Sequence, residues 1–381
     1  MSRNALKVVA INLLVLAGLL AALELGLQAI AWARPSHDVL FLQPDEKLGW
    51  KQVPGLRWRW TGNHWYAAEF DVPVATNRLG FRDLERPLEK PSGVKRIAFL
   101  GDSFIEAVQV PVEQTAAKRA EELLNAARKG PQPSWETLNF GISNFGVGQY
   151  LLTWDAYAKA YRPDYVAVLV AGLHMRRAVT RFESGAFPES ESRLWVRPTF
   201  RLEQNDLVLE PARDFQRFVE AQNARIEQDF GGQRTRRKQQ LIVPHYLRLL
   251  RDRAAGVLRP AAPGASPVRT GVAGGPADDA SGFPGVGLRL LEEMGRRIAS
   301  QGGQMIVLDV TRYFGDEASL SGQLSELCRI HGFGYVPAYE RLLEANARGI
   351  ATRWRHDAHL NREGNDLLAQ SLVDWLRRQP H

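Results

Sequence analysis

Short apolar runs alternate with amphipathic segments from about residue 96 to the end of the chain. We expect strands over five apolar runs: Ile97–Leu100, Thr137–Phe140, Tyr165–Ala171, Met305–Val310 and Gly334–Val336. Apolar residues recur at helical spacing in the segments between them, which predicts helices over Ala116–Ala127, Gln149–Tyr161, Gly287–Ser300, Leu320–His331 and Gly364–Arg377. This alternation indicates an α/β fold whose mostly parallel sheet is covered on both faces. In such folds ligands bind beyond the carboxyl ends of the strands.

The pattern is interrupted over residues 175–285. Two short runs, Thr199–Leu202 and Leu207–Glu210, predict a hairpin, and Phe215–Phe230 and Tyr246–Val257 have helical spacing. Residues 259–285 are rich in Gly, Pro and Ala and bury little apolar area, so we expect a flexible surface loop there.

The amino-terminal segment has the composition of a membrane anchor. Val8–Leu23 contains no charged residue, and its apolar character continues to Trp32. A helix over residues 8–32, rising ~1.5 Å per residue, is long enough to cross the ~30 Å core of a bilayer. Basic residues are more numerous before the segment than after it, which places the amino terminus in the cytoplasm and the rest of the chain outside. A cleaved signal peptide is the alternative, although Glu24 lies where its cleavage region would be.

Three parts of the chain follow from these patterns: an anchor over residues 1–35, a small region of strands and loops over 36–92, and a main domain over 93–381 with the insertion at 175–285. The middle region is rich in aromatic residues: Trp50, Trp58, Trp60, Trp65, Tyr66 and Phe70. We expect these side chains to pack as a small core, with a sugar-binding surface as the alternative.

Composition narrows the function classes. The 381 residues include 49 Lys and Arg against 42 Asp and Glu, a formal charge of +7, and a single cysteine, Cys328. One cysteine excludes an intramolecular disulfide framework and a metal centre built from several cysteines. A mean hydropathy of −0.27 argues against a polytopic membrane protein.

Basic residues cluster in the insertion: Arg234, Arg236, Arg237, Lys238, Arg248, Arg251 and Arg253. The cluster lacks aromatic interleaving and a nucleic-acid-binding motif, so no nucleic-acid partner is expected. A solvated helix face is the simpler interpretation, and contact with anionic lipid or acidic polysaccharide is the alternative.

Candidate chemistry begins where the first strand of the main domain ends. Gly101-Asp102-Ser103 follows this strand directly, so that Ser103 projects at the carboxyl edge of the sheet near backbone N–H groups that suit an oxyanion. The segment is not a Gly-x-Ser-x-Gly elbow, because residue 105 is Ile. Asp and Ser are also common helix N-caps, so a purely structural role is the alternative.

A complementary group of residues precedes the last predicted helix. His359 can serve as the base for a serine nucleophile, and Asp357 can orient its imidazole. The alternatives are a helix cap with exposed histidines, or a metal site formed by His356, Asp357 and His359. No second cluster of ligands accompanies these residues, so we expect no metal.

Gly101-Asp102-Ser103 after the first strand and Asp-x-His before the last helix together resemble the SGNH/GDSL hydrolase superfamily. Three upstream segments are similar to membrane-anchored bacterial members: Leu48-Gly49-Trp50, Phe70–Pro73 and Thr76–Asp83. The resemblance implies a flavodoxin-like three-layer sandwich and serine-dependent ester hydrolysis or acyl transfer without a cofactor. It also implies that Ser103 is the nucleophile, His359 the base and Asp357 its partner.

The chain departs from the family pattern in its second and third motif blocks. Asn144 occupies the place of a glycine whose backbone N–H helps to form the oxyanion hole. Leu173 stands where the family has an asparagine side-chain donor, and the neighbouring His174 could replace it. Asp357 lies two residues before His359, whereas three is the commoner spacing. The oxyanion hole is therefore expected from Ser103, Asn144 and His174.

We hypothesise a single-pass inner-membrane protein, anchored through residues 8–32, whose periplasmic domain cleaves or transfers an acyl ester on a cell-envelope carbohydrate. The alternative, favoured by the missing third-block asparagine and the aromatic region, is a non-catalytic envelope-assembly or glycan-binding protein with the same fold.

Overall fold

The structure is a computed structural model that describes residues 3–33, 37–64, 67–128, 132–180, 196–212, 215–237 and 283–379, with the single positions 243 and 247. Most of the expected helix over Tyr246–Val257 and of the expected loop over 259–285 lies outside the described residues.

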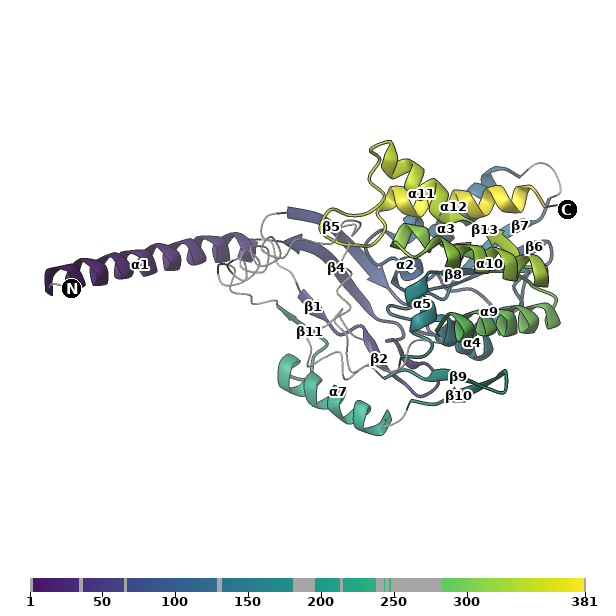
Figure 1. Cartoon of the computed structure of the whole chain (residues 1–381), viewed down its shortest axis with the longest axis horizontal. Helices are drawn as coiled ribbons and strands as arrows, with labels where there is room; N and C mark the ends of the chain where they lie inside the picture. The colour runs from purple at the N-terminus through teal and green to yellow at the C-terminus, as the bar shows by residue number, and fades with distance from the viewer. Residues whose placement is uncertain are drawn as a thin grey trace.

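A five-stranded parallel sheet forms the centre of the main domain (Figure 1). Its strands, in spatial order, are β13 (Gly334–Val336), β12 (Gln304–Asp309), β8 (Tyr165–Val170), β6 (Val94–Leu100) and β7 (Ser134–Asn139). Every neighbouring pair is parallel. Numbered along the chain within this domain, the order is 5-4-3-1-2, the doubly wound order of flavodoxin-like folds. The expected α/β three-layer sandwich and all five expected strands are confirmed.

Helices cover both faces of the sheet, because successive strand residues point to opposite sides. Ala98 and Leu100 of β6 pack in one core, whereas Ile97 and Phe99 pack in the other. The first core lies under α4 (Val147–Ala156), α9 (Phe283–Ser300) and α10 (Ala318–His331). The second lies under α3 (Ala116–Ala126), α11 (Ala338–Ala347) and α12 (Arg362–Arg377).

The five expected helices of the main domain are present with small shifts at their ends. Only the end of the segment Gln149–Tyr161 differs in kind: α4 ends at Ala156, and a 3₁₀ helix over Ala158–Tyr161 follows. Helix α11 was not expected from the pattern. Two short helices follow strands at their carboxyl ends, α2 (Ser103–Glu106) after β6 and α5 (Gly172–Arg176) after β8.

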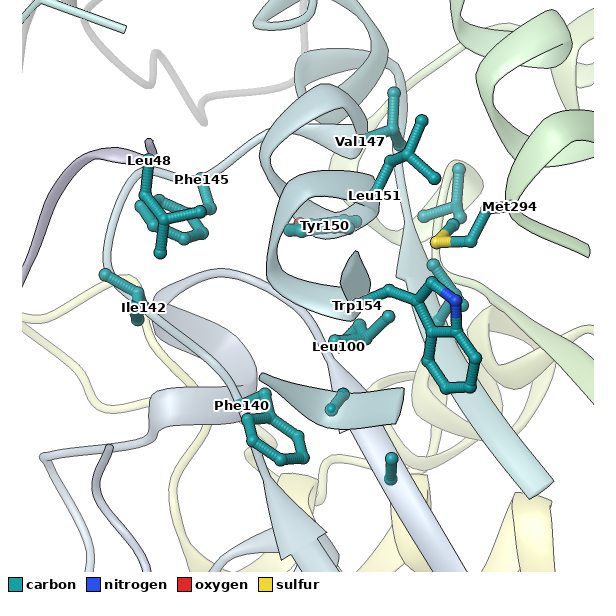
Figure 2. Close-up of a cluster of buried hydrophobic side chains, with 14 of the residues drawn as sticks. Leu48, Leu100, Phe140, Ile142, Phe145, Val147, Tyr150, Leu151, Trp154 and Met294 are labelled. Carbon is teal, nitrogen blue, oxygen red and sulfur yellow. The ribbon is translucent and has the colours of Figure 1, made fainter. Parts of the chain in front are cut away.

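The upstream region forms antiparallel pairs of strands: β2 (Leu42–Asp45) with β3 (Gly49–Gln52), and β4 (Arg57–His64) with β5 (Ala67–Ala75). Its side chains Trp50, Trp58 and Phe70 are buried, which confirms the expectation of packing for these three. They join the core under α4 instead of forming a separate one. Figure 2 shows this junction, where Leu48 of the upstream region lies beside Phe145 of the main domain.

Within the insertion, β9 (Thr199–Glu203) and β10 (Asp206–Glu210) form the expected hairpin, and α7 (Phe215–Phe230) is the expected helix. A helix face was expected for the basic cluster, but the first residues of the cluster are not helical. Arg234 instead donates to the carbonyl oxygen of Leu40 at 3.0 Å, and β11 (Thr235–Arg237) pairs with β1 (His37–Val39). Backbone pairing with the upstream region explains the difference. Lys238, Arg248, Arg251 and Arg253 lie outside the described residues.

Helix α1 (Arg3–Ala33) projects from the rest of the chain (Figure 1). Its segment Ala5–Ile30 has a mean hydropathy of 2.4, and none of its most apolar window is buried inside the protein. Length and composition therefore fit a membrane span, and they fit a signal sequence equally.

Candidate active site

Ser103 begins helix α2 at the carboxyl end of strand β6. The preceding Asp102 caps this helix, its Oδ1 accepting the backbone N–H of Phe104 at 3.0 Å. Gly101 makes the turn possible, because a Cβ at this position would lie 2.2 Å from Cγ1 of Ile105. The N-cap role foreseen for this segment thus belongs to Asp102, which leaves the Ser103 hydroxyl for other contacts.

Ser103 and His359 meet although they lie 256 positions apart in the sequence. His359 Nε2 is 2.8 Å from Ser103 Oγ, and His359 Nδ1 is 2.6 Å from Asp357 Oδ1. Both His359 and Asp357 lie on the loop between α11 and α12, and the backbone N–H of His359 also donates to Asp357 Oδ1 at 2.8 Å. A carboxylate at Nδ1 fixes the imidazole proton there, so Nε2 is free to accept the serine proton.

The surroundings of His359 favour its protonated form. Burial lowers the pKa of the imidazole, but the hydrogen bond and charge of Asp357 raise it, with smaller contributions from Asp102 and Glu106. The net effect is a pKa above the usual value for histidine. Phe104 packs beside the ring, with a centroid distance of 5.1 Å. The side chain of His359 is 27% exposed, so a substrate can reach the pair from solvent.

The loop over residues 141–146 follows strand β7 and lies against helix α2. Gly141 allows this close approach, because a Cβ there would lie 2.4 Å from the backbone nitrogen of Glu106. Asn144 has φ +65, the left-handed region that an asparagine tolerates better than most residues. No acceptor among the described residues takes its backbone N–H. Asn144 therefore offers a main-chain donor beside the helix that carries Ser103.

His174 lies elsewhere than expected for an oxyanion donor. The backbone N–H of Ala171 donates to His174 Nδ1 at 3.0 Å, so the proton of the neutral ring is on Nε2. Nε2 in turn lies 3.1 Å from Asp102 Oδ2. Both ring nitrogens thus face protein groups, and the side chain is fully buried. In this structure His174 therefore pairs with the carboxylate of Asp102, the residue before Ser103.

Arg177, which the sequence did not single out, completes this arrangement. Its Nη1 lies 3.0 Å from Asp102 Oδ2, and its Nη2 donates to Asn144 Oδ1 at 3.3 Å. Burial would raise the pKa of Asp102, but His174, Arg177 and the N–H of Phe104 outweigh it and hold the pKa well below its usual value. Asp102, ionised at neutral pH, therefore links the turn before Ser103 to the loop that carries Asn144.

The third-block position has no polar side chain, as the sequence indicated. Leu173 is partly buried against the core beneath α11 and α12. The N–H of Gly172 is used to bind the carboxylate of Asp316 at 2.6 Å. Within the described ranges, no group of three or more His, Cys, Asp or Glu side chains is arranged to hold a metal ion.

Two acidic residues that contact the site's supporting loops were also missed from the sequence. Glu69 on strand β5 accepts backbone N–H groups of the loop that carries Asp357 and His359. Glu106, at the end of α2, bonds to Ser143 in the 141–146 loop. Neither residue lies in a motif, and each acts on a segment distant in sequence, so local patterns contain no signal for them.

No protein-family model matches this chain, and no curated protein matches it by sequence. Among solved structures, Axe2, an acetylxylan esterase from Geobacillus stearothermophilus, is similar at 10% identity, with 75% of this chain and 95% of that chain covered and a TM-score of 0.39. A putative GDSL-like lipase from Parabacteroides merdae is similar at 11% identity, covering 75% and 96%, with a TM-score of 0.39. TesA is similar at 11% identity, covering 74% and 98%, with a TM-score of 0.39.

Proposed function

We propose that this chain is a serine-dependent ester hydrolase or acyltransferase of the SGNH/GDSL type. The contact between Ser103 Oγ and His359 Nε2, with Asp357 at the other ring nitrogen, is the observation that carries the proposal. A hydroxyl, an imidazole and a carboxylate in this order are the components of an activated serine nucleophile. Ser103 and His359 lie 256 positions apart in the sequence and meet at the carboxyl edge of the sheet, where doubly wound folds place their ligands.

The geometry supports a two-step reaction. Ser103 Oγ attacks the acyl carbonyl carbon while His359 Nε2 takes the hydroxyl proton, and Asp357 stabilises the imidazolium. The backbone N–H groups of Ser103 and Asn144 hold the negative oxygen of the tetrahedral intermediate. His359 then protonates the departing alcohol, leaving an acyl-serine. Water or an acceptor hydroxyl attacks this ester while His359 takes its proton, and His359 then returns that proton to Ser103 Oγ as the acyl product leaves.

An oxyanion hole of two main-chain donors lacks the side-chain donor of the family pattern. Loss of one such donor reduces turnover by a factor on the order of 10²–10³. We therefore expect a slow enzyme toward simple esters, with additional binding contacts supplied by its natural substrate.

We further propose that α1 anchors the protein in the inner membrane and holds the site in the periplasm, where acylated cell-envelope carbohydrate is the substrate class. The apolar, solvent-facing surface of α1 and the basic residues Arg3 and Lys7 at its amino-terminal end support this placement. Alkaline phosphatase fused after the carboxyl terminus is active only outside the cytoplasm. An active fusion is expected, and an inactive, stable fusion would contradict the orientation.

The direct test of the activity is hydrolysis of p-nitrophenyl acetate by the detergent-purified full chain and by Ser103→Ala. A fluorophosphonate should also label the wild-type protein at Ser103. We expect both the turnover and the labelling to be lost in Ser103→Ala. Equal rates for the two proteins would remove the catalytic assignment and favour a non-catalytic glycan-binding protein, which should then bind glycan with or without the serine.

A further inference from the structure

Glu106 is a fully buried carboxyl group that the proton transfer from Ser103 to His359 does not use. It is the last residue of helix α2, three positions after the nucleophile. One carboxylate oxygen accepts the hydroxyl of Ser143, and the other accepts the side-chain amide of Gln52. The carboxyl group therefore joins three segments: the helix of the nucleophile, the 141–146 loop and strand β3.

Burying a carboxyl group at this depth is costly, and the protein surrounds it with compensating groups. Burial raises the pKa of Glu106 to about 7, against the opposing effects of the Ser143 hydrogen bonds, the Arg82 charge and Gln52. Arg82 also donates to the backbone carbonyl oxygens of Glu106 at 2.9 Å and of Ala107 at 2.6 Å. A buried, titratable group with this many dedicated partners is unusual in a core, which points to a use for it.

The contact to Ser143 acts next to the residue that supplies the second oxyanion donor. Asn144 follows Ser143 directly and holds a left-handed backbone conformation that depends on its surroundings. Trp50 Nε1 donates to the Ser143 carbonyl oxygen at 3.1 Å and so fixes the peptide group between Ser143 and Asn144. The backbone carbonyl of Asn144 accepts from Arg197 Nη2 at 3.2 Å.

The apolar neighbours of Ser143 and Asn144 in the loop are anchored in the core. Ile142 and Phe145, both labelled in Figure 2, are fully buried, and in the sequence they flank the two polar residues. Between these two anchors, the Glu106 carboxylate is the only side chain of α2 that bonds to the loop among the described residues. Glu106 thereby adds a side-chain link between the helix of Ser103 and the loop of Asn144, beside the bridge from Asp102 through Arg177 to Asn144.

We propose that Glu106 is a positioning residue that fixes the 141–146 loop against the nucleophile helix and so keeps the two main-chain oxyanion donors at a constant separation. This role rests on the proposed function of Ser103. Because oxyanion donors act mainly in the transition state, a loosened loop should lower kcat and leave KM nearly unchanged.

The test compares the detergent-purified full chain with Glu106→Leu, Ser143→Ala, the double variant and Glu106→Gln on p-nitrophenyl acetate. Fluorophosphonate titration counts the competent molecules, so that kcat refers only to folded protein. Glu106→Leu and Ser143→Ala should each lower kcat by about 10- to 100-fold, with KM within about twofold, since small misplacements of catalytic groups cost up to ~10²-fold. The double variant should be no slower than the slower single one, because both remove the same contact.

Glu106→Gln should recover most of the lost turnover, since an amide oxygen can still accept the Ser143 hydroxyl. Glu113→Gln is the matched control: this exposed acid also faces Arg82 but makes no hydrogen bond to the loop in the described part of the chain. Its kcat should equal that of the wild type. If Glu106→Leu does not fold, Ser143→Ala decides alone, since it removes one hydroxyl from a half-buried position.

The two possible failures give different results. If Ser103→Ala is inactive but Ser143→Ala and Glu106→Leu keep kcat within twofold of the wild type, the role of Glu106 is overturned and the hydrolase assignment stands. If Ser103→Ala is as active as the wild type, the proposed function fails, and the role of Glu106 fails with it.

Discussion

The carboxylate of Glu69 accepts the backbone N–H of Arg355 at 2.8 Å, across 286 positions of sequence. The same carboxylate accepts the N–H of His356 at 3.1 Å and 3.0 Å through its two oxygens. Next to it, Phe70 packs on Trp354 with a ring-centroid distance of 5.2 Å. Strand β5 of the upstream region therefore holds the loop on which Asp357 and His359 lie, which gives this region a part in forming the site.

Replacing Glu69 by Ala should lower kcat by about tenfold, because two backbone N–H groups lose their acceptor and the His359 imidazole is held less firmly. Steady-state kinetics on p-nitrophenyl acetate measures the effect, and KM should change little. Asp71→Asn is the matched control, since Asp71 lies on the same strand and pairs only with the exposed Arg59 among the contacts described. Equal kcat values for Glu69→Ala and Asp71→Asn would contradict the positioning role of β5.

Asp357→Asn should lower kcat by roughly 10⁴-fold, the loss associated with the wrong imidazole tautomer when the orienting carboxylate is replaced. It should also move the acid limb of the pH–rate profile. In the wild type the pKa of His359 is raised, so activity is lost as the pH falls through a value above ~6.5, where the base becomes protonated. Without Asp357 this pKa decreases, and the limb moves to lower pH. A limb at unchanged pH in Asp357→Asn would show that another group controls it.

His174→Leu should destabilise the protein by roughly 1–3 kcal/mol at pH 7, because the buried Asp102 carboxylate loses a partner. The pKa of Asp102 is below its unfolded value, so its contribution to stability is complete above pH ~4 and is lost as the pH falls below that. Urea denaturation in detergent at pH 7 and pH 3 measures the free energy of unfolding of the wild type and of His174→Leu. The difference between the two proteins should be smaller at pH 3 than at pH 7. A difference that is larger at pH 3 than at pH 7 would contradict an ionised Asp102 paired with His174.

The sheet could be predicted from the sequence because it is encoded locally. Apolar runs such as Tyr165–Val170 are buried on both faces of the sheet. The motifs around Ser103 and around His359 each lie next to a strand or helix boundary. The pairing of Ser103 with His359 followed from those motifs and from the family resemblance. Helix α11 was missed although its residues 338–347 have ordinary helical spacing, since it follows the very short strand β13 with only Pro337 between them.

The supporting contacts of the site could not be predicted in the same way. Glu69, Glu106 and Arg177 each bond to a segment far away in sequence, and their own neighbours give no indication of the partner. His174 illustrates the reverse error: its position in the third block suggested an oxyanion donor, but the N–H of Ala171 and the carboxylate of Asp102 occupy its two nitrogens. Which of several partners a buried histidine takes depends on tertiary distances, and a single sequence does not contain these.

Two variants of Asn144 test whether the second oxyanion donor is the backbone N–H of this residue. If its backbone N–H is the active group, Asn144→Gly should keep kcat within about threefold of the wild type, because glycine adopts φ +65 without a steric penalty. Asn144→Val should lower kcat by about 10²–10³-fold, since a β-branched residue disfavours this conformation and withdraws the donor. The pair also separates the N–H from the side chain, whose oxygen accepts from Arg177 at 3.3 Å and is absent in both variants. Equal losses in the two variants would therefore assign the effect to the contact with Arg177, and the main-chain donor would have to be sought elsewhere in the 141–146 loop.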